Sequence, residues 1–286
     1  MHPVKITKAH GEKEFFSKEK LVRSLRRSHV SDDVINAVVS EITSQLTEGM
    51  STKEIFRRAF ELLRQYTPPH AARYKLKQGI NELGPSGFPF EQYVGALLAS
   101  EGYSVKTGII LQGHCVRHEV DVIAEKDEQY VMVECKYHNA QGIHCDVKIP
   151  LYIHSRFLDI DQELKDSAEH SLRQRKMMIF TNTRFTDDAI TYGNCIGIRL
   201  VGWDYPRGDS LRERVNAAGL HPLTCMTTLT NHEKGLLLEE GLVLCRQIFQ
   251  KPEILGKIGI SSAERQERIL NESRLISALP RPNGND

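Results

Sequence analysis

The first 80 residues place apolar side chains mainly at helical spacing, after a short strand-like start. Residues 4–7 are expected to form a strand, and residues 14–16 to pair back with it after a turn at His10 and Gly11. Ser17 is a typical N-cap residue before the first helix. Two more helices are predicted at 31–48 and 51–65. The first part of the chain is therefore expected to be mostly helical, with one small hairpin.

Residues 81–90, with the sequence NELGPSGFPF, contain two glycines and two prolines, which is typical of a linker. The hydrophobic pattern changes after this segment. Beyond it the pattern is mixed: a helix, three strands, a helix, a strand, a helix and a strand. These elements are expected at 90–102, 103–111, 117–125, 129–137, 150–172, 177–181, 186–194 and 196–203. From about residue 210 the pattern is helical again, and the polar end at 277–286 is expected to be disordered.

The predicted fold is therefore multidomain α/β. The expected units are a mostly helical domain with a small β-hairpin at 1–82, an α/β core with a mixed sheet at 88–204, and a small helical region at 210–276. A hydrophobic content of 40% and a charged content of 26% exclude collagen-like, disordered and coiled-coil chains as descriptions of the whole.

Charge divides the chain although the total is only +1. Residues 1–80 hold 15 basic and 9 acidic side chains, a surplus of +6, and the remainder carries −5. The basic surplus indicates an anionic partner for the first domain. No apolar run is long enough to span a bilayer or to serve as a secretory signal, so the expected location is cytoplasmic. The six cysteines lack the spacing of a disulfide framework.

Three charged residues interrupt two apolar strands in the middle of the chain. Glu134 and Lys136 are two residues apart, so they share one face of their predicted strand, and Asp121 interrupts the strand before it. A carboxylate in such surroundings needs compensation, which a divalent cation provides. Two carboxylates suit Mg²⁺, and Lys136 could orient a water or neutralise developing charge. This is the chemistry of phosphodiester hydrolysis, although a simple cross-strand ion pair would also fit the spacing.

The same residues resemble the signature of the PD-(D/E)xK nucleases, in particular the Mrr-like restriction endonucleases. The resemblance covers about residues 88–204. It is carried by HEVDVIA at 118–124, VECKY at 133–137, FTNTRFTDDA at 180–189 and IGIRL at 196–200. It implies a restriction-endonuclease-like core in which Asp121, Glu134 and Glu91 bind Mg²⁺ or Mn²⁺. Lys136 would be the catalytic lysine, and Glu91 would complete the catalytic set from the preceding helix.

Histidine and cysteine residues gather near this motif. As an alternative, these side chains could bind zinc, but no pair of them has the spacing of a structural zinc site. These residues are Cys115, His118, Cys135, His138, His144 and Cys145. Four other side chains are candidates to face phosphates, with solvated or packing roles as the alternative: His138, Lys148, His154 and Arg156.

Basic residues cluster in the hairpin and first helix, where Lys20, Arg23 and Arg27 could form one cationic stripe. Nucleotide phosphates, a nucleic-acid backbone or solvent would each suit such a stripe. The sequence here also resembles the ATP-cone domain of ribonucleotide reductases and their transcriptional regulator, over about residues 2–80. The matching segments are ITKAHG at 6–11, EFFSKEKL at 14–21, MSTKEI at 50–55 and AARY at 71–74.

The ATP-cone resemblance implies an allosteric site for ATP or dATP. Lys8 and Lys20 would contact phosphates, with Glu14 and Thr52 nearby. The turn Lys8-Ala-His-Gly11 departs from the usual Lys-Arg-Asp-Gly of that family, so the domain could instead serve only in dimerisation.

The C-terminal helices faintly resemble helix-hairpin-helix modules, with glycines at 235 and 241 that would permit close approach to DNA. Packing or oligomerisation is the alternative role. Together these features predict a Mg²⁺-dependent DNA endonuclease, regulated by an adenine nucleotide and acting as a homodimer or higher oligomer. The alternative is a non-catalytic, nucleotide-responsive DNA-binding regulator.

Overall fold

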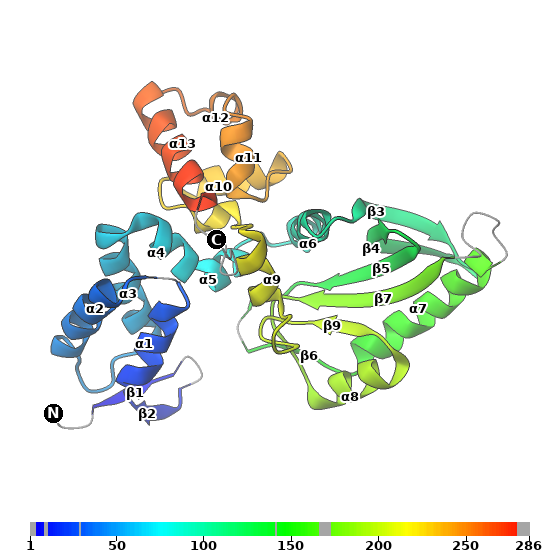
Figure 1. The fold of residues 1–286 in the computed structure, drawn as a ribbon, viewed down its shortest axis with the longest axis horizontal. Helices are drawn as coiled ribbons and strands as arrows, with labels where there is room; N and C mark the ends of the chain where they lie inside the picture. The colour runs from blue at the N-terminus through cyan, green and yellow to red at the C-terminus, as the bar shows by residue number, and fades with distance from the viewer. Residues whose placement is uncertain (1–3, 9–10, 29, 141, 166–172, 279–286) are drawn as a thin grey trace.

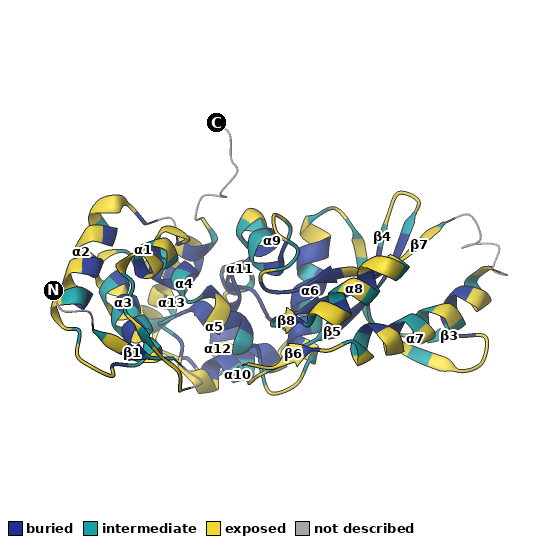
Figure 2. Ribbon diagram, turned by 90° about the horizontal axis from the view of Figure 1, so that it is seen from below, coloured by how far each residue is buried: buried dark blue, intermediate teal, exposed yellow. Residues whose placement is uncertain are grey.

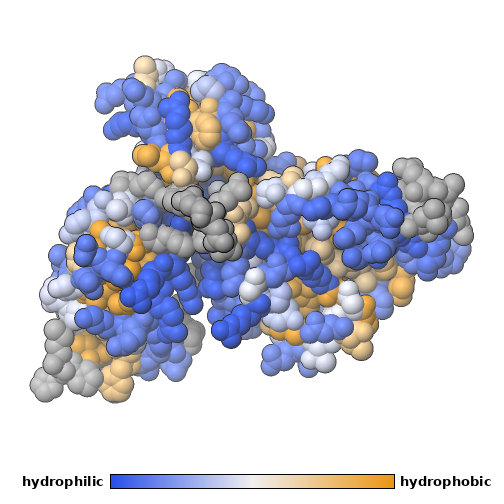
Figure 3. Space-filling view, viewed as in Figure 1, coloured by the Kyte–Doolittle hydropathy of each residue, from blue (hydrophilic) through white to orange (hydrophobic). Residues whose placement is uncertain are grey.

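The computed structural model describes residues 4–8, 11–28, 30–140, 142–165 and 173–278. Three lobes are visible in Figure 1: an N-terminal bundle, a lobe built on a five-stranded sheet, and a set of C-terminal helices. The protein is thus mixed α/β. Polar side chains cover most of the face seen in Figure 3. Among the described helices, none is both long and apolar enough to cross a membrane.

The N-terminal lobe has a core of its own, formed by apolar residues between Ile6 and Ala71. Ser17 caps the first helix as expected, since its hydroxyl accepts the backbone N–H of Lys20 at 3.1 Å. His10 of the expected hairpin turn lies outside the described residues, and Gly11 has a positive φ of 89°. The elements of this lobe are β1 (Lys5–Thr7), β2 (Lys13–Phe15), α1 (Lys18–Arg26), α2 (Asp32–Ser44), α3 (Thr52–Tyr66) and α4 (Pro68–Tyr74).

The central sheet has the order β3-β4-β5-β7-β9. The first three strands are antiparallel, and the last two join in parallel, so the sheet is mixed as predicted. The strands are β3 (Ser104–Gln112), β4 (Arg117–Lys126), β5 (Gln129–Lys136), β7 (Gln174–Thr181) and β9 (Arg199–Val201). A separate parallel pair, β6 (His144–Cys145) and β8 (Arg184–Phe185), was not predicted, because two-residue strands leave no periodic signal.

Helices cover both faces of this sheet (Figure 1). One face packs on α6 (Phe88–Ser100), and the other on α7 (Lys148–Lys165) and α8 (Asp187–Ile196). α8 ends at Ile196, two residues later than predicted, where the left-handed φ of 78° at Gly197 terminates the helix. β9 therefore starts at Arg199 rather than at residue 196. Residues 166–172 of the expected long helix lie outside the described residues.

The C-terminal helices share one continuous core with the sheet lobe, running from Ala72 to Ile276. Two hydrogen bonds join distant parts of the chain: the Tyr93 hydroxyl donates to the Leu220 carbonyl at 2.6 Å, and the Thr224 hydroxyl to that of Gly79 at 2.6 Å. The C-terminal helices are α9 (Leu211–Ala218), η1 (Leu223–Cys225), α10 (Asn231–Glu239), α11 (Cys245–Gln250), α12 (Ile254–Lys257) and α13 (Ala263–Ser277). The short helix α5 (Leu76–Asn81), which precedes the sheet lobe in the chain, contributes to the same core. In Figure 2, buried segments of α5 and α6 lie in the middle of the molecule. Residues 279–286 of the expected tail are outside the described part.

Candidate functional site

Asp121 lies at an irregularity in the sheet. It is missing from the pairing of β4 with both neighbours, and the last residue pair between β4 and β5 is Val122 with Val133. Val120 and Ile123 both pack on the α7 side, although strict alternation would put them on opposite faces. The alternation therefore breaks at Asp121. The backbone N–H of Cys135 donates to Asp121 Oδ2 at 2.7 Å, so a side-chain carboxylate replaces a ladder acceptor here.

Glu134 is buried on the next strand and is held by two cations. Its Oε1 lies 2.5 Å from Lys136 Nζ, and its Oε2 accepts from Arg156 Nη1 at 2.7 Å. Only 5% of Glu134 is exposed, beside a small cavity that is otherwise mainly apolar, so its charge requires such partners. The expectation that Glu134 and Lys136 share a face of the strand is confirmed.

Arg156 is fixed from several directions. It comes from α7, and its guanidinium also donates to the Glu119 carbonyl at 3.0 Å and to the Tyr152 hydroxyl at 2.6 Å. The same group stacks over the Tyr152 ring, 4.7 Å from its centroid. Burial opposes the charge of Arg156, but Tyr152 and Glu134 together raise its pKa. Arg156 is therefore part of the carboxylate cluster through its ion pair with Glu134, and its role as a phosphate-facing residue stays a prediction.

Glu91 lies in the first turn of α6 and interacts electrostatically with the same cluster. Burial, followed by repulsion from Asp121, Glu119 and Glu134, raises its pKa to about 7. Burial and repulsion from Glu134 likewise raise the pKa of Asp121 to about 6. Burial lowers the pKa of Lys136, but the hydrogen bond and charge of Glu134 outweigh it, so that pKa is raised overall. The carboxylates thus repel one another, and added positive charge at this place would stabilise them.

The side chains of this cluster supply only part of the ligands that a hard divalent cation needs. Within the described part of the chain, no three His, Cys, Asp or Glu side chains gather closely enough to hold a metal together. Magnesium, however, is commonly bound through one or two carboxylates, with water completing its shell. Asp121 and Glu134 can supply these two carboxylates, at the point where the pairing of β4 with β5 ends. Glu91 is an electrostatic neighbour of both and not a third member of a formed ligand group.

A polar network anchors the chain just after Lys136. The Tyr137 hydroxyl donates to the Asn81 carbonyl at 2.5 Å. Asn182 accepts the backbone N–H of His138 at 2.9 Å and donates to the His138 carbonyl at 2.7 Å and to Asn81 Oδ1 at 2.9 Å. The sequence reasoning missed this role of Asn81 and Asn182. The only available signal was the position of Asn182 within the nuclease-like segment 180–189.

The other candidates from the sequence are dispersed. His154 Nδ1 lies 2.8 Å from the Tyr192 hydroxyl of α8, so this histidine has a packing partner. Lys148 is exposed at the start of α7. His138 Nε2 is 3.4 Å from Cys145 Sγ, whereas His118 pairs with Asp159 at 2.7 Å. Cys135 faces the core on the α6 side, and Cys115 and His144 are exposed. These residues form no common metal site among those described.

The N-terminal lobe brings together three of its four predicted nucleotide-binding residues. Glu14 Oε2 lies 3.2 Å from Lys8 Nζ and 2.9 Å from Lys20 Nζ. Hydrogen bonds from Lys20 and Lys8 lower the pKa of Glu14. Thr52 is the first residue of α3, next to Ser51, whose backbone pairs with Thr7 of β1. The two lysines therefore share one carboxylate.

The fold and this cluster define a mixed α/β protein with paired carboxylates and a lysine at a break between two strands. Its C-terminal part, residues 221–277, matches the family described as AF1548-like, C-terminal. An uncharacterized protein of Archaeoglobus fulgidus is 35% identical over 181 residues, which are 63% of this chain and 98% of the relative. The crystal structure of the protein of unknown function AF1548 matches with a TM-score of 0.55 and 33% identity, over 67% of this chain and 98% of that one.

The chain belongs to the AF1548-like family. The matched residues 221–277 begin just before η1 and end with α13, so the family segment corresponds to the helices that close the shared core. About a third of this chain has no counterpart in these two relatives.

Proposed function

We propose that this protein is a Mg²⁺-dependent DNA endonuclease whose sheet lobe is a restriction-endonuclease-like core of the Mrr-like, PD-(D/E)xK type. The observation that carries the proposal is the placement of Asp121 beside the Glu134–Lys136 pair, where β4 and β5 separate. A half-buried Asp121 whose pKa is raised, the buried carboxylate of Glu134 and the neighbouring Lys136 are suited to metal-assisted phosphodiester hydrolysis.

Each residue has a definite part in this proposal. Asp121 and Glu134 would hold the cation, which polarises the scissile phosphate and lowers the pKa of an attacking water. Lys136 lies within hydrogen-bonding distance of Glu134, so its ammonium is positioned to orient a water or to neutralise charge on the phosphate. Glu91 would add negative charge that favours the cation. Concerted cleavage of both strands of a duplex would use two such sites, so we also propose a homodimer or higher oligomer.

Relaxation of supercoiled plasmid tests the proposal. The purified protein should convert the plasmid to the nicked form in the presence of MgCl₂ or MnCl₂ and not in EDTA. An Asp121→Asn protein purified in parallel should be inactive, which excludes a contaminating nuclease. Nicking by both proteins alike, or by neither, would contradict the proposed site.

A non-catalytic DNA-binding regulator is the second candidate. One observation favours it: Glu134 already has two cationic partners, Lys136 and Arg156, so its burial does not depend on a metal. The plasmid assay separates the two candidates when it is combined with a gel-shift measurement. Metal-independent DNA binding without nicking in either cation would support the regulator.

We further propose that the N-terminal lobe is ATP-cone-like and binds ATP or dATP through Lys8, Lys20, Glu14 and Thr52. A polyphosphate would replace Glu14 as the partner of the two lysines. Calorimetry should detect binding of dATP or ATP to the parent, weakened about tenfold or more by Lys8→Ala, which removes a charge-assisted contact. Lys53→Ala, an exposed lysine of α3, is the matched control and should bind as the parent does. Absence of heat with either nucleotide would remove the sensing role.

A further inference from the structure

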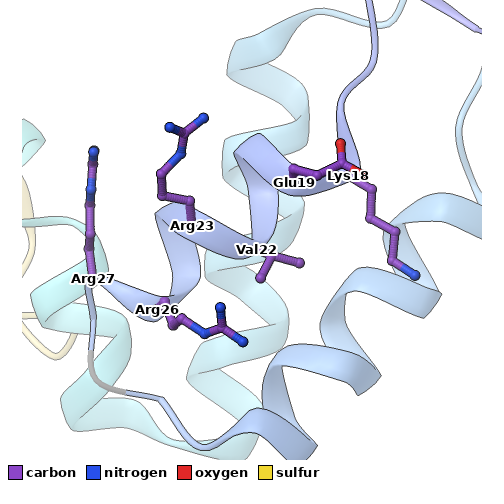
Figure 4. Close-up of a pocket in the computed structure, with 6 residues that line it drawn as sticks. All are labelled: Lys18, Glu19, Val22, Arg23, Arg26 and Arg27. Atoms are coloured by element: carbon purple, nitrogen blue, oxygen red, sulfur yellow. The ribbon is translucent and has the colours of Figure 1, made fainter.

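An exposed cationic face of α1 takes no part in either proposed site. Its side chains line an open pocket on the outside of the helix (Figure 4). The opposite side of α1 buries Leu21 and Leu25 in the core of the N-terminal lobe. The residues of this α1 face are Lys18, Glu19, Val22, Arg23, Arg26 and Arg27. Four of these six are cations.

Most of these cations have no ion-pair partner among the described residues. Arg26 donates to Asp32 at 3.2 Å. For Lys18, Arg23 and Arg27, no described residue supplies a carboxylate within ion-pair distance. The single anion, Glu19, accepts a hydrogen bond from the Ser17 hydroxyl at 2.9 Å and so belongs to the helix cap. The α1 face therefore presents positive charge to the outside.

The stability of the helix does not account for this arrangement. Arg23 and Arg26 lie near the C-terminal end of α1, where the helix dipole favours cations. Lys18 is in the first turn, where the dipole opposes a cation. Arg23 and Arg27 are four residues apart and rise on the same side of α1 in Figure 4, so their charges repel. An external anion would relieve that repulsion.

The structure also separates this face from the proposed nucleotide site. The sequence placed Lys20 in one stripe with Arg23 and Arg27, but Lys20 Nζ lies 2.9 Å from Glu14 instead. Lys20 thus joins Lys8 in the candidate nucleotide site, and the arginines remain available. An open surface on one helix lacks the enclosing walls that a mononucleotide site usually has, whereas an extended polyanion can lie along it.

We propose that the α1 face binds the phosphate backbone of the duplex DNA that serves as substrate, an inference that rests on the proposed nuclease function. Arginine forks match phosphate oxygens bidentately, and such contacts hold DNA without reading its sequence. The chain after residue 80 carries a net charge of −5, so the nuclease lobe has no overall basic surplus with which to attract DNA. The N-terminal lobe, with a net charge of +6 over residues 1–80, supplies this basic surplus.

Fluorescence anisotropy with a labelled duplex of about one to three helical turns tests the α1 face in EDTA, where metal-dependent cleavage does not interfere. Arg23→Glu/Arg27→Glu in the full-length protein should raise Kd at least tenfold at low salt. The slope of log K against log salt should fall by about 2, because two phosphate contacts are lost. Arg23→Gln/Arg27→Gln should show the same change of slope with a smaller loss of affinity. Circular dichroism establishes that the variants are folded.

Arg57→Glu/Arg64→Glu is the matched control, because both arginines are exposed on α3 of the same lobe. Equal losses in the control and the α1 variants, or an unchanged salt slope in the α1 variants, would overturn the proposal. Displacement of the duplex by polyglutamate as readily as by unlabelled DNA of equal charge would also overturn it, since the face would then suit an acidic protein. Plasmid nicking by Asp121→Asn at the parent's rate would contradict the nuclease site alone, leaving the binding result to be judged separately.

Discussion

Asp121→Asn is expected to reduce Mg²⁺-dependent plasmid nicking by about 10³-fold, because the metal's charge stabilisation is worth several kcal/mol in such sites. The substitution removes one of the two carboxylates proposed to hold the cation. It retains an oxygen that can accept the Cys135 N–H, so the local backbone contact survives. Burial and Glu134 already raise the pKa of Asp121, and loss of its charge should therefore leave the protein at least as stable. Initial nicking rates and urea unfolding together measure these effects.

Two further variants make this expectation specific. Lys136→Ala should lower the rate by about 10²- to 10³-fold, the usual effect of removing one group that stabilises charge in a transition state. Asp127→Asn is the matched control for Asp121: it lies in the exposed turn between β4 and β5, with a φ of 51° that asparagine also tolerates. Lys176→Ala on β7 serves the same purpose for Lys136. Parental rates in both site variants would show that the cluster is not catalytic.

The contribution of His221 to the unfolding free energy should fall by about 2 kcal/mol between pH 7.5 and pH 5. Only 2% of this residue is exposed, and burial together with nearby Arg73 lowers its pKa to about 4, against a smaller opposing effect of the backbone at Gly219. In the unfolded chain a histidine titrates near 6.5. Between those values the unfolded state binds the additional proton, so stability is full above about pH 6.5 and falls as the pH drops toward 4. The raised pKa values of Glu91 and Asp121 act in the opposite direction over this interval, so the loss is measured as the difference in urea unfolding between the parent and a variant that lacks His221.

The contribution of His221 can be isolated by substitution. His221→Leu keeps a similar volume and cannot take up a proton, so it should lose about 2 kcal/mol less than the parent over the same pH interval. Neither ring nitrogen has a partner of hydrogen-bonding geometry among the described residues, so leucine leaves no broken bond at those atoms. The exposed His232, changed to leucine, should preserve the parental pH dependence. Identical pH dependence in the parent and His221→Leu would contradict the expectation.

Local patterns predicted most secondary structure. The helix cap at Ser17, the helices α2 and α3, and the three antiparallel strands follow from capping chemistry and hydrophobic period, which act over a few residues. Short elements such as β6 and β8 were missed, since their pairing depends on chain segments about 40 residues apart. The start of β9 was displaced because Gly197 ends α8 later than expected.

The sequence also did not predict that the sheet lobe and the C-terminal helices share one core. The predicted boundary near residues 204–210 marks a change of pattern, yet apolar side chains on both sides of it belong to one cluster. Contacts such as Tyr93 with Leu220 join residues 127 positions apart. Sequence periodicity reports which side of an element is apolar and carries no information about the element that covers it.

By itself, the sequence determined the mixed α/β class, the common face of Glu134 and Lys136, and the basic character of the N-terminal lobe, because these depend on composition and on periods of two or 3.6 residues. Only the tertiary structure decided that Asp121 lies at a break in the strand alternation, that Arg156 reaches Glu134 from α7, and that Lys20 turns to Glu14, away from the arginines of α1. Each of these outcomes is a contact between separate elements. The geometry of such contacts is set by packing and by the need to compensate buried or neighbouring charge, and a local pattern specifies neither.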